Sequence, residues 1–300
     1  WQEVIRENIL LPLDMSRSYT TIAALGTDSD ASKGYSTMGG VNYLNDDTPI
    51  FAMAPAGSMV SSVSDMSHWT MAWLKNGAFN GTQVIPEAYL KKAMQTQKSL
   101  NNDIGYGYGW ITSLYNDHRK VEHGGNINGF SSLVTLFPND TIGIVVLSNQ
   151  EASSIPSVVA GTIADRLFQL PKKDWIGEAK SAQAAAAEKA QQAIVTLAEE
   201  QITGTVPSAS LSDYTGTYGN GGFGEMEILL QGDVLIAQGQ FFTVLLHHYH
   251  NDSFQVYFGP GQPTAMIGEF SFDDTNQVNG FQINLEPKVD PVFFSRVANE

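Results

Sequence analysis

The feature that most constrains this sequence is a change of pattern between Glu178 and Gln201, where the chain becomes rich in Ala, Gln and Glu. High helix propensity with a thin apolar face is typical of a surface helix or of a helix that bridges two domains. An oligomerisation helix is the alternative, although the apolar residues lack sustained heptads. Because 300 residues suit about two domains, we predict modules at 1–175 and 204–300, joined by a helical linker at 176–203.

Composition excludes several partners and kinds of chemistry. A formal net charge of −15 with only 16 Lys and Arg argues against nucleic acid, which is bound mostly through clustered basic side chains. With no cysteine, the chain has no disulfide, no thiolate metal site and no cysteine nucleophile. No apolar run reaches the length that spans a bilayer, so we expect no transmembrane segment. We also expect no cofactor.

The first module alternates helical and strand-like patterns. Apolar residues at helical spacing predict a helix from Trp1 that Pro12 stops, and a Gly-, Ser- and Asn-rich stretch from Thr20 to Met53 is typical of a long surface excursion. Further helices are predicted after Ser61, at Pro86 and at Val159–Leu170, and strands at 106–114, 119–123, 131–137 and 142–148. Short connections favour an antiparallel sheet, so we predict an α+β fold.

The second module contains short β-rich runs separated by Gly, Asn and Asp, which predicts an all-β sandwich or barrel. The expected runs are 224–230, 234–238, 243–246, 254–258, 265–272, 280–285 and 292–296. A barrel of about eight strands is filled by its own side chains or holds one small ligand. We favour core packing for the aromatic residues of this module: Phe241, Phe242, Tyr249, Phe254, Tyr257, Phe258, Phe270, Phe272 and Phe281.

His123-Gly124-Gly125 is the main candidate for chemistry, because it presents an imidazole beside a backbone without side chains. Glycines let a ligand approach a strand edge closely and bond to its unpaired N–H groups. The alternative is a turn that needs positive φ at Gly124 or Gly125, with His123 capping it. Taken alone, the tripeptide favours the turn.

A wider set of motifs changes this balance. The sequence contains Gly105-Tyr106-Gly107-Tyr108-Gly109-Trp110, His123-Gly124-Gly125, Gly129-Phe130, Phe137-Pro138 and Gly143–Asn149, and upstream of them Pro12–Met15, Gly34-Tyr35, Ala54–Ser58 and Asp65–Trp69. In this order they resemble the C-terminal part of class C β-lactamase-related serine hydrolases, in the penicillin-binding-protein/β-lactamase superfamily. Leu211–Tyr218 and Phe294-Ser295-Arg296 resemble the lipocalin-like β-domain often appended to these hydrolases. The resemblance implies a partial β-lactamase/DD-peptidase-like antiparallel sheet with helices, followed by a small lipocalin-like barrel.

The resemblance also implies acyl transfer to water through a serine ester. In the family a Ser-x-x-Lys serine attacks a carbonyl, a Tyr-x-Asn tyrosine moves protons, and a Lys-Thr-Gly or His-x-Gly strand lines the cleft. By this resemblance His123 has a proton-relay or electrostatic role, and the backbone N–H of Asn126 helps to bind the oxyanion. Gly124 and Gly125 line the substrate site. Peptides, D-amino-acid compounds, β-lactams and small esters all stay open as substrates.

The sequence departs from the family pattern in several places. No serine is followed three residues later by lysine, so the nucleophile and its base are missing. Tyr43-Leu44-Asn45 spells Tyr-x-Asn but lies downstream of Pro12–Met15, whereas the family's motif lies upstream, so we interpret it as a coincidence in a loop. Asp14 stands where the family usually has Gly, and Asp tolerates a left-handed backbone better than most residues.

Without a serine to acylate, covalent catalysis has no first step, so we expect this chain alone to be inactive. We favour a fragment whose partner is the missing N-terminal half of the hydrolase domain, from the same precursor or from another chain, because Trp1 enters within a family-like helix. A processed product is one alternative, and a degenerate, non-catalytic relative that binds a ligand or peptidoglycan is another. The resemblance implies a periplasmic or extracellular location.

Two other groups are weaker candidates. His248 and His250 would share one face of a strand, with Asp252 nearby, but further ligands are not evident and we expect no metal site. Ser58 follows Ala56-Gly57 without a Gly-x-Ser-x-Gly frame. We expect Ser58 to help begin the next helix rather than to act as a nucleophile.

Overall fold

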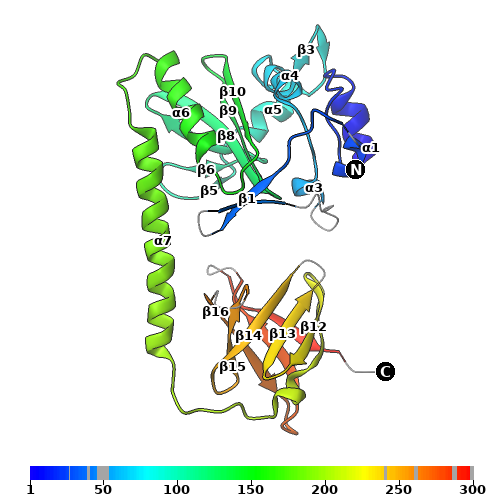
Figure 1. The fold of residues 1–300 in the computed structure, drawn as a ribbon. Coiled ribbons are helices and arrows are strands. Elements are labelled where there is room, and N and C mark those ends of the chain that lie inside the picture. The colour runs from blue at the N-terminus through cyan, green and yellow to red at the C-terminus, as the bar shows by residue number, and fades with distance from the viewer. Residues whose placement is uncertain are drawn as a thin grey trace. The chain divides into compact units, whose positions relative to one another are not determined.

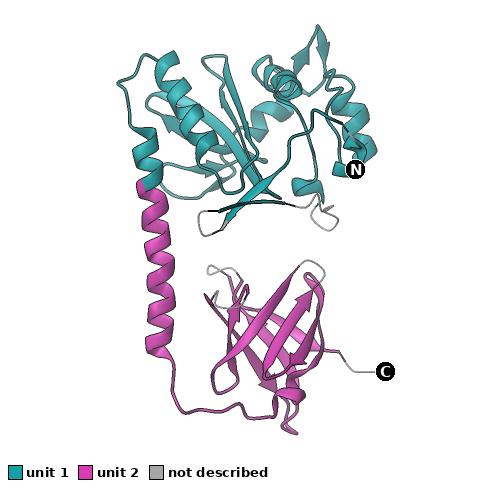
Figure 2. Ribbon diagram, viewed as in Figure 1, with its two compact units in different colours: residues 1–180 teal, residues 181–300 magenta. Residues whose placement is uncertain are grey.

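The computed structural model describes residues 1–26, 28–38, 41–45, 54–239, 242–259, 263–285 and 289–297. The chain divides into two units, residues 1–180 and 181–300, each built round its own core (Figures 1 and 2). Helices and an antiparallel sheet in the first unit and a closed barrel in the second confirm the predicted α+β fold class. The helix expected as a linker is present as α7 (Trp175–Glu200), while the domain boundaries predicted from the sequence stay a prediction. Among the described residues, no helix has the length and apolar character needed to cross a bilayer.

The main sheet of unit 1 is an antiparallel meander of six strands in the order β10-β9-β8-β7-β6-β5. Neighbours in space are therefore neighbours in sequence, as short turns require. The predicted strand 106–114 is divided, because the chain turns at Gly109, where φ is +75°. The strands are β5 (Lys98–Ser99), β6 (Gly105–Tyr106), β7 (Ile111–Tyr115), β8 (His118–Ile127), β9 (Phe130–Phe137) and β10 (Ile142–Ser148).

Helices cover both faces of this sheet (Figure 1). Alternation along β9 sends Leu136 into a core shared with α4 (Val63–Leu74) and α5 (Glu87–Ala93), and sends Leu133 and Phe137 into a core shared with α6 (Ile155–Leu167). Strand β9 is thus packed on both of its faces. The other elements of unit 1 are α1 (Gln2–Ile5), a π-helical turn at Arg6–Leu10, α2 (Ile22–Leu25), α3 (Ala54–Gly57), and the hairpins β1 (Tyr35–Met38) with β2 (Val41–Leu44) and β3 (Ala78–Phe79) with β4 (Thr82–Gln83).

Two expectations about local structure in unit 1 are wrong. Helix α4 begins after Ser62, whose hydroxyl accepts a hydrogen bond from the N–H of Asp65 at 3.2 Å, so Ser58 does not start it. The hydroxyl of Ser58 instead donates to the carbonyl of Thr20. Tyr43 lies in strand β2, not in a loop. By contrast, Asp14 does adopt the left-handed backbone expected of it, with φ +53°.

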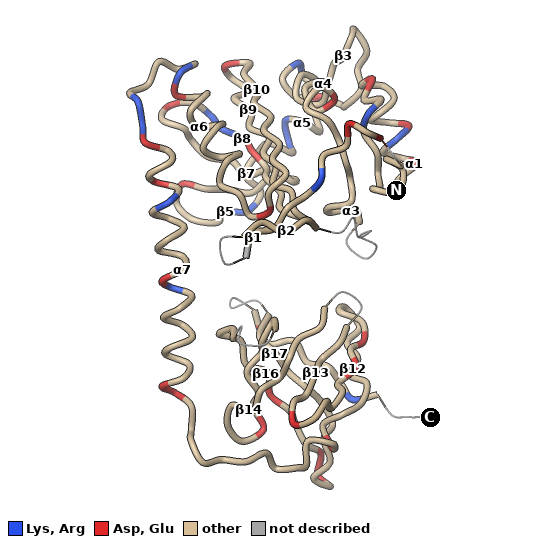
Figure 3. The backbone as a smooth tube through the Cα atoms, viewed as in Figure 1, with Lys and Arg blue, Asp and Glu red and all other residues tan. Residues whose placement is uncertain are grey.

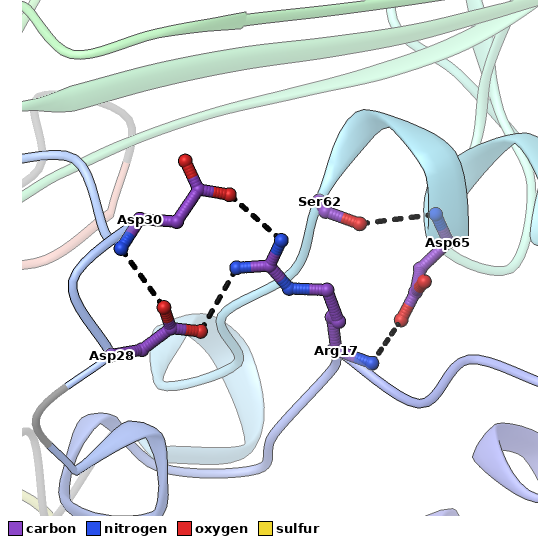
Figure 4. A network of polar contacts seen from close by, with 5 residues as sticks. All are labelled: Arg17, Asp28, Asp30, Ser62 and Asp65. Atoms are coloured by element: carbon purple, nitrogen blue, oxygen red, sulfur yellow. Dashed lines mark hydrogen bonds and ion pairs between the residues drawn. The ribbon is translucent and has the colours of Figure 1, made fainter.

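A buried carboxylate attaches the N-terminal segment to α4. Asp65 is 4% exposed, and its side chain accepts hydrogen bonds from the N–H of Arg17 at 2.8 Å and from the hydroxyl of Ser18 at 2.7 Å. The guanidinium of Arg17 in turn donates to Asp28 at 2.9 Å and to Asp30 at 2.7 Å (Figure 4). The chain that leads to β1 is therefore fixed at several points by one small network.

A second carboxylate joins α6 to the start of α7. Asp165 accepts hydrogen bonds from the hydroxyl of Tyr115 and, at 2.6 Å, from the indole N–H of Trp175. Burial, together with this carboxylate, raises the pKa of Tyr115. Gly161 is required here, because a Cβ on it would lie 2.6 Å from the ring of Trp175. The first turn of α7 thus packs directly on α6.

Unit 2 is a closed antiparallel barrel of eight strands, β11 to β18. Phe254, Phe270 and Phe281 are buried with Tyr214 and Tyr218 in its core, which confirms core packing for these phenylalanines. Phe242 and Phe258 are exposed instead, and Phe241 lies outside the described residues. The strands are β11 (Gly216–Asn220), β12 (Gly224–Gln231), β13 (Val234–Gly239), β14 (Thr243–His250), β15 (Ser253–Tyr257), β16 (Pro263–Phe272), β17 (Val278–Ile283) and β18 (Val292–Arg296).

Two histidines of β14, His248 and His250, each bind backbone. His248 donates from Nε2 to the carbonyl of Asn251 at 2.9 Å, and Nδ1 of His250 accepts from the N–H of Ile202 at 3.3 Å. The pairing of β14 with β15 shifts register between His248 and His250, so the strict alternation that would place both imidazoles on one face does not hold. Within the described ranges, no three His, Asp or Glu side chains are grouped so that they can hold a metal ion.

Charge is distributed unevenly between the units. Beyond residue 203, the sequence has one Lys, Lys288, and one Arg, Arg296, and Figure 3 shows Lys and Arg mostly in unit 1. Arg296 is used inside the barrel unit, where its guanidinium donates to the carbonyls of Thr215 at 2.6 Å and Val278 at 3.1 Å. Most of the acidic excess of the chain therefore belongs to the barrel unit.

Asp252 anchors the segment that precedes the barrel. Its carboxylate accepts hydrogen bonds from the hydroxyl of Tyr214 at 2.5 Å and from the hydroxyl and N–H of Ser208 at 2.7 and 2.8 Å. Burial alone would raise the pKa of Asp252, but the hydrogen bonds from Tyr214 and Ser208 outweigh it and the pKa is lowered.

The substitution Asp252→Asn should destabilise the barrel by about 1–3 kcal/mol near neutral pH, because the buried Tyr214 and the exposed Ser208 lose a charged acceptor. A carboxyl whose folded pKa is lowered stabilises the fold above its unfolded pKa of about 3.9, and this contribution is lost as the pH falls through the folded value. Hydrogen exchange of peptides from residues 208–256 should therefore show protection that falls with acid in the wild type and depends less on pH in the variant. Asp233→Asn, at an exposed turn, is the control; equal protection in both variants would contradict the assignment.

Candidate functional site

Strand β8 has two partner strands along its first half and one along its second. It pairs with β9 as far as Ile127 and Phe130, but with β7 only as far as Glu122, which lies opposite Ile111. Within the described residues, the segment His123–Ile127 therefore has strand pairing on one side only, and we call it the open edge of β8. Its first four residues, His123 to Asn126, are exposed to solvent. The predicted site residues thus lie at the surface and are not enclosed in a core.

The turn that closes the β8–β9 hairpin is separated from the glycine pair by two residues, Asn126 and Ile127. Asn128 and Gly129 have φ of +47° and +86°, the left-handed pair that a tight two-residue hairpin needs. Neither Gly124 nor Gly125 has positive φ, and both lie inside β8. The alternative interpretation of the tripeptide as a turn is therefore wrong, and β8 continues beyond the strand end predicted at His123.

The position of this turn determines which backbone groups face the open edge. In a two-residue hairpin, the residues that flank the turn, here Ile127 and Phe130, exchange the first pair of ladder hydrogen bonds. Successive pairs then alternate between bonded and non-bonded, so Asn126 and Gly124 fall in non-bonded pairs with β9. Their N–H groups accordingly point away from β9, towards the open edge.

The side chain of Asn126 is occupied on the β9 side. Its Oδ1 accepts a hydrogen bond from the hydroxyl of Ser131, which is 3% exposed. Ser131 also accepts from the N–H of Ser153 at 3.0 Å and lies 2.7 Å from the carbonyl of Gln150. The bond from Ser131 thus helps to orient Asn126, whose backbone N–H and C=O both face the open edge.

His123 has a partner that sequence reasoning did not assign. Nε2 of His123 lies 3.2 Å from the hydroxyl oxygen of Tyr106, and the two rings meet edge to face at 68°, with centroids 6.1 Å apart. Tyr106 comes from β6, two strands away, and reaches His123 past the end of β7. The repeated Gly-Tyr-Gly pattern around Tyr106 was the available signal, but only the strand pairing identifies which tyrosine makes the contact.

Glycines that lie far apart in the sequence pack the hairpin turn against β1. The N–H of Tyr35 donates to the carbonyl of Gly129 at 3.1 Å, and a Cβ on Gly129 would lie 2.5 Å from backbone atoms of Gly34 and Tyr35. On the other side, a Cβ on Gly57 would lie 2.7 Å from the side chain of Ile127. These close backbone approaches hold the end of the open edge in place.

Two hollows of unit 1 lie away from the open edge. One, of about 460 Å³, is lined among others by Thr96, Ile104 and Arg119, and the other, of about 100 Å³, by Lys120, Glu122 and Ala160. Neither is lined by His123 or Asn126. Lys120 and Glu122, which precede His123 on β8, form an ion pair at 2.5 Å.

An antiparallel meander covered by helices on both faces, followed by a separate barrel, defines the class as a β-lactamase-like module with an appended β-domain. A family model described as Beta-lactamase matches residues 1–166, and the chain belongs to this family of serine hydrolases. A second model, described as Domain of unknown function (DUF3471), matches residues 200–296, which contain the barrel.

Individual relatives are similar over parts of their length. Protein flp of Staphylococcus aureus (strain MW2) is 29% identical over 167 residues, which are 53% of this chain and 31% of that protein. Unguisins hydrolase ungD' of Aspergillus campestris is 24% identical over 253 residues, 76% of this chain and 45% of that protein. The octameric penicillin-binding protein homologue from Pyrococcus abyssi has a TM-score of 0.50 and 21% identity, covering 98% of this chain and 60% of that one. The chain thus spans less than half the length of the two curated relatives, and the structural likeness supports the fold alone.

The substitution Gly129→Ala should destabilise unit 1 by about 3 kcal/mol or more, because it adds a backbone clash to the strain of left-handed φ. Gly81→Ala is a matched control: Asn80-Gly81 forms the same kind of turn, with φ of +48° and +79°, and a Cβ there meets nothing within 4 Å. The control should lose only about 1–2 kcal/mol. Urea unfolding followed by tryptophan fluorescence reports on unit 1, since all 5 tryptophans lie within residues 1–180. Equal losses would show that the close approach to Gly34 and Tyr35 is unimportant.

Proposed function

We propose that this chain is part of a serine hydrolase that acts through an acyl-enzyme on peptide, β-lactam or ester bonds, and that the open edge of β8 is one wall of its cleft. One observation carries the proposal: in a chain of the β-lactamase family, the His123–Asn126 segment is exposed and lacks a strand partner on one side. A hydrolase among the relatives supports the same reaction class. The substrate within that class stays open.

The chemistry assigns separate tasks to the residues of this edge. A serine oxygen bonds to the substrate carbonyl carbon, its proton passes through a base to the leaving group, and water then cleaves the ester and restores the serine. Negative charge builds on the carbonyl oxygen during both steps. The N–H of Asn126 points to the side from which that oxygen can approach, and the serine's own N–H is its partner donor. Gly124 and Gly125 leave room for a substrate to lie along the strand.

The nucleophile is proposed to come from polypeptide outside these 300 residues, in the same precursor or in another chain. No Ser-x-x-Lys occurs in the sequence, and the chain covers 31% of protein flp. Neither of the two hollows described above is lined by the open edge, which fits a cleft whose second wall lies in that other polypeptide. The same missing motif favours a second function, that of a non-catalytic relative that binds a ligand or peptidoglycan.

The location is proposed to be periplasmic or extracellular. Its support is the family resemblance alone, and fractionation of the native cells with detection of this chain tests it.

Labelling with a fluorophosphonate and with a penicillin should distinguish the two functions. The 300-residue chain should form no adduct, whereas the native parent polypeptide, or this chain mixed with the segment that carries Ser-x-x-Lys, should be acylated on that serine. In the acylated form His123→Ala should lower turnover by about 100-fold. Asn126→Ala, which keeps the backbone N–H, should lower it by no more than about threefold. An adduct on this chain by itself, or full turnover in His123→Ala, would falsify the proposed division of roles; no adduct in any form would favour the binding protein.

A further inference from the structure

The contact between Tyr106 and His123 joins two strands that do not pair with each other. Strand β7 lies between β6 and β8 and starts at Ile111, which faces Tyr106 on one side and Glu122 on the other. His123 is the first residue of β8 beyond the end of β7. The side chain of Tyr106 therefore reaches His123 where β7 no longer separates them, with Oη 3.2 Å from Nε2. His123 is exposed and Tyr106 is half-buried, so the imidazole of this contact is available to a bound substrate.

The direction of this hydrogen bond follows from the acid–base character of the two groups. A neutral imidazole has one nitrogen that donates and one that accepts, and a phenol can do either. The imidazole nitrogen is by far the stronger base of the two acceptors, and the phenolic O–H is a good donor. Tyr106 therefore donates to Nε2 while the ring is neutral. The tautomer of a histidine is set by the bond that its other nitrogen makes, so the ring proton lies on Nδ1.

We propose that Tyr106 is a positioning residue that fixes His123 as the Nδ1–H tautomer, so that His123 acts on the substrate as a hydrogen-bond donor and not as a base. Among the described residues, no hydrogen bond to Nδ1 is found, and this nitrogen is the one left to meet a substrate. The catalytic meaning of this inference rests on the proposed function. Of the two roles considered for His123, proton relay and electrostatic stabilisation, it favours the electrostatic one. The groups suited to such a donor are the oxyanion and a carboxylate on the substrate.

The donor role persists when the ring is protonated. In the imidazolium both nitrogens carry hydrogen, so Nε2–H donates to the oxygen of Tyr106 and Nδ1–H still faces the substrate. Among the described residues, the titratable groups on adjoining strand positions include Tyr106 itself, Lys98 opposite Tyr106 on β5, and Glu122 next to His123 on β8, which is paired with Lys120. The residue that faces His123 on β9 is Val134, which does not titrate. Loss of Tyr106 should therefore matter most where the ring is neutral.

A direct test is the tautomer of His123 in the free chain, which needs no activity. Two-bond imidazole ¹⁵N–¹H spectra of the labelled 300-residue protein, at a pH where the ring is neutral, should show Nδ1 protonated and Nε2 as an acceptor. The signal is assigned by its loss in His123→Gln. In Tyr106→Phe the signal should move towards the Nε2–H tautomer, and in Tyr108→Phe it should not. Tyr108 is the matched control, because it lies in the same Gly-Tyr-Gly-Tyr-Gly segment but its ring contacts Lys92, 5.6 Å from the centroid. An Nε2–H tautomer in the wild type would overturn the inference while leaving the proposed hydrolase function intact.

The acylation-competent form supplies the second readout. Tyr106→Phe should lower kcat/KM about fivefold where the ring is neutral, and the loss should shrink as the pH falls and the imidazolium restores Nδ1–H. A purely structural role predicts a loss that is independent of pH, and that outcome would also reject the inference. Tyr108→Phe should leave the profile unchanged. If no form of the protein is acylated, the proposed function fails and the tautomer result stands by itself.

Discussion

The unequal length of two neighbouring strand pairings is the constraint on which the candidate site depends. Strand β8 stays paired with β9 up to the hairpin turn, but its pairing with β7 ends several residues earlier. An antiparallel strand with one partner keeps every second N–H and C=O unpaired. Such an edge invites pairing with other chains unless it is short or in use, so five residues of open edge are tolerable. The same difference in length makes room for Tyr106 to reach His123.

Precise placement of this edge rests on close approaches to glycine backbone at three positions. Gly34, Gly57 and Gly129 each lie where a Cβ would overlap another group, so the two distant segments that carry Gly34 and Gly57 converge on the end of the hairpin. Elsewhere, a single carboxylate that accepts several hydrogen bonds joins one segment of the chain to another. Asp65 binds the N-terminal segment, Asp165 binds α7 to α6, and Asp252 binds the segment before the barrel. In each case one ionised carboxylate accepts several hydrogen bonds that the donor groups would otherwise make to water.

Periodicity along the chain predicts the elements well where hydrophobic burial forms them. The helices around Met66, Leu90 and Ile163 and the strands from Ser131 to Ser148 correspond to α4, α5, α6, β9 and β10. The pattern fails where local polarity hides an element. Strand β11 was not predicted as a run of its own, because Gly216–Asn220 is polar apart from Tyr218, and the β1–β2 hairpin was hidden in a Gly- and Ser-rich stretch. These strands form because partners supply their ladder bonds, not because their own residues demand it.

By itself, the sequence determined the division into two unlike modules, the α+β class, the missing Ser-x-x-Lys and the ordered motifs that lead to the β-lactamase family. These features depend on residue identity and spacing, which the chain carries whether or not it is folded. Only the tertiary structure decided that His123-Gly124-Gly125 is an extended edge instead of a turn, which N–H groups face outward, and that Tyr106 is the partner of His123. Those outcomes depend on where neighbouring strands stop pairing. The length over which two strands pair is set by the packing of residues far apart in the sequence, so a local sequence pattern does not predict it.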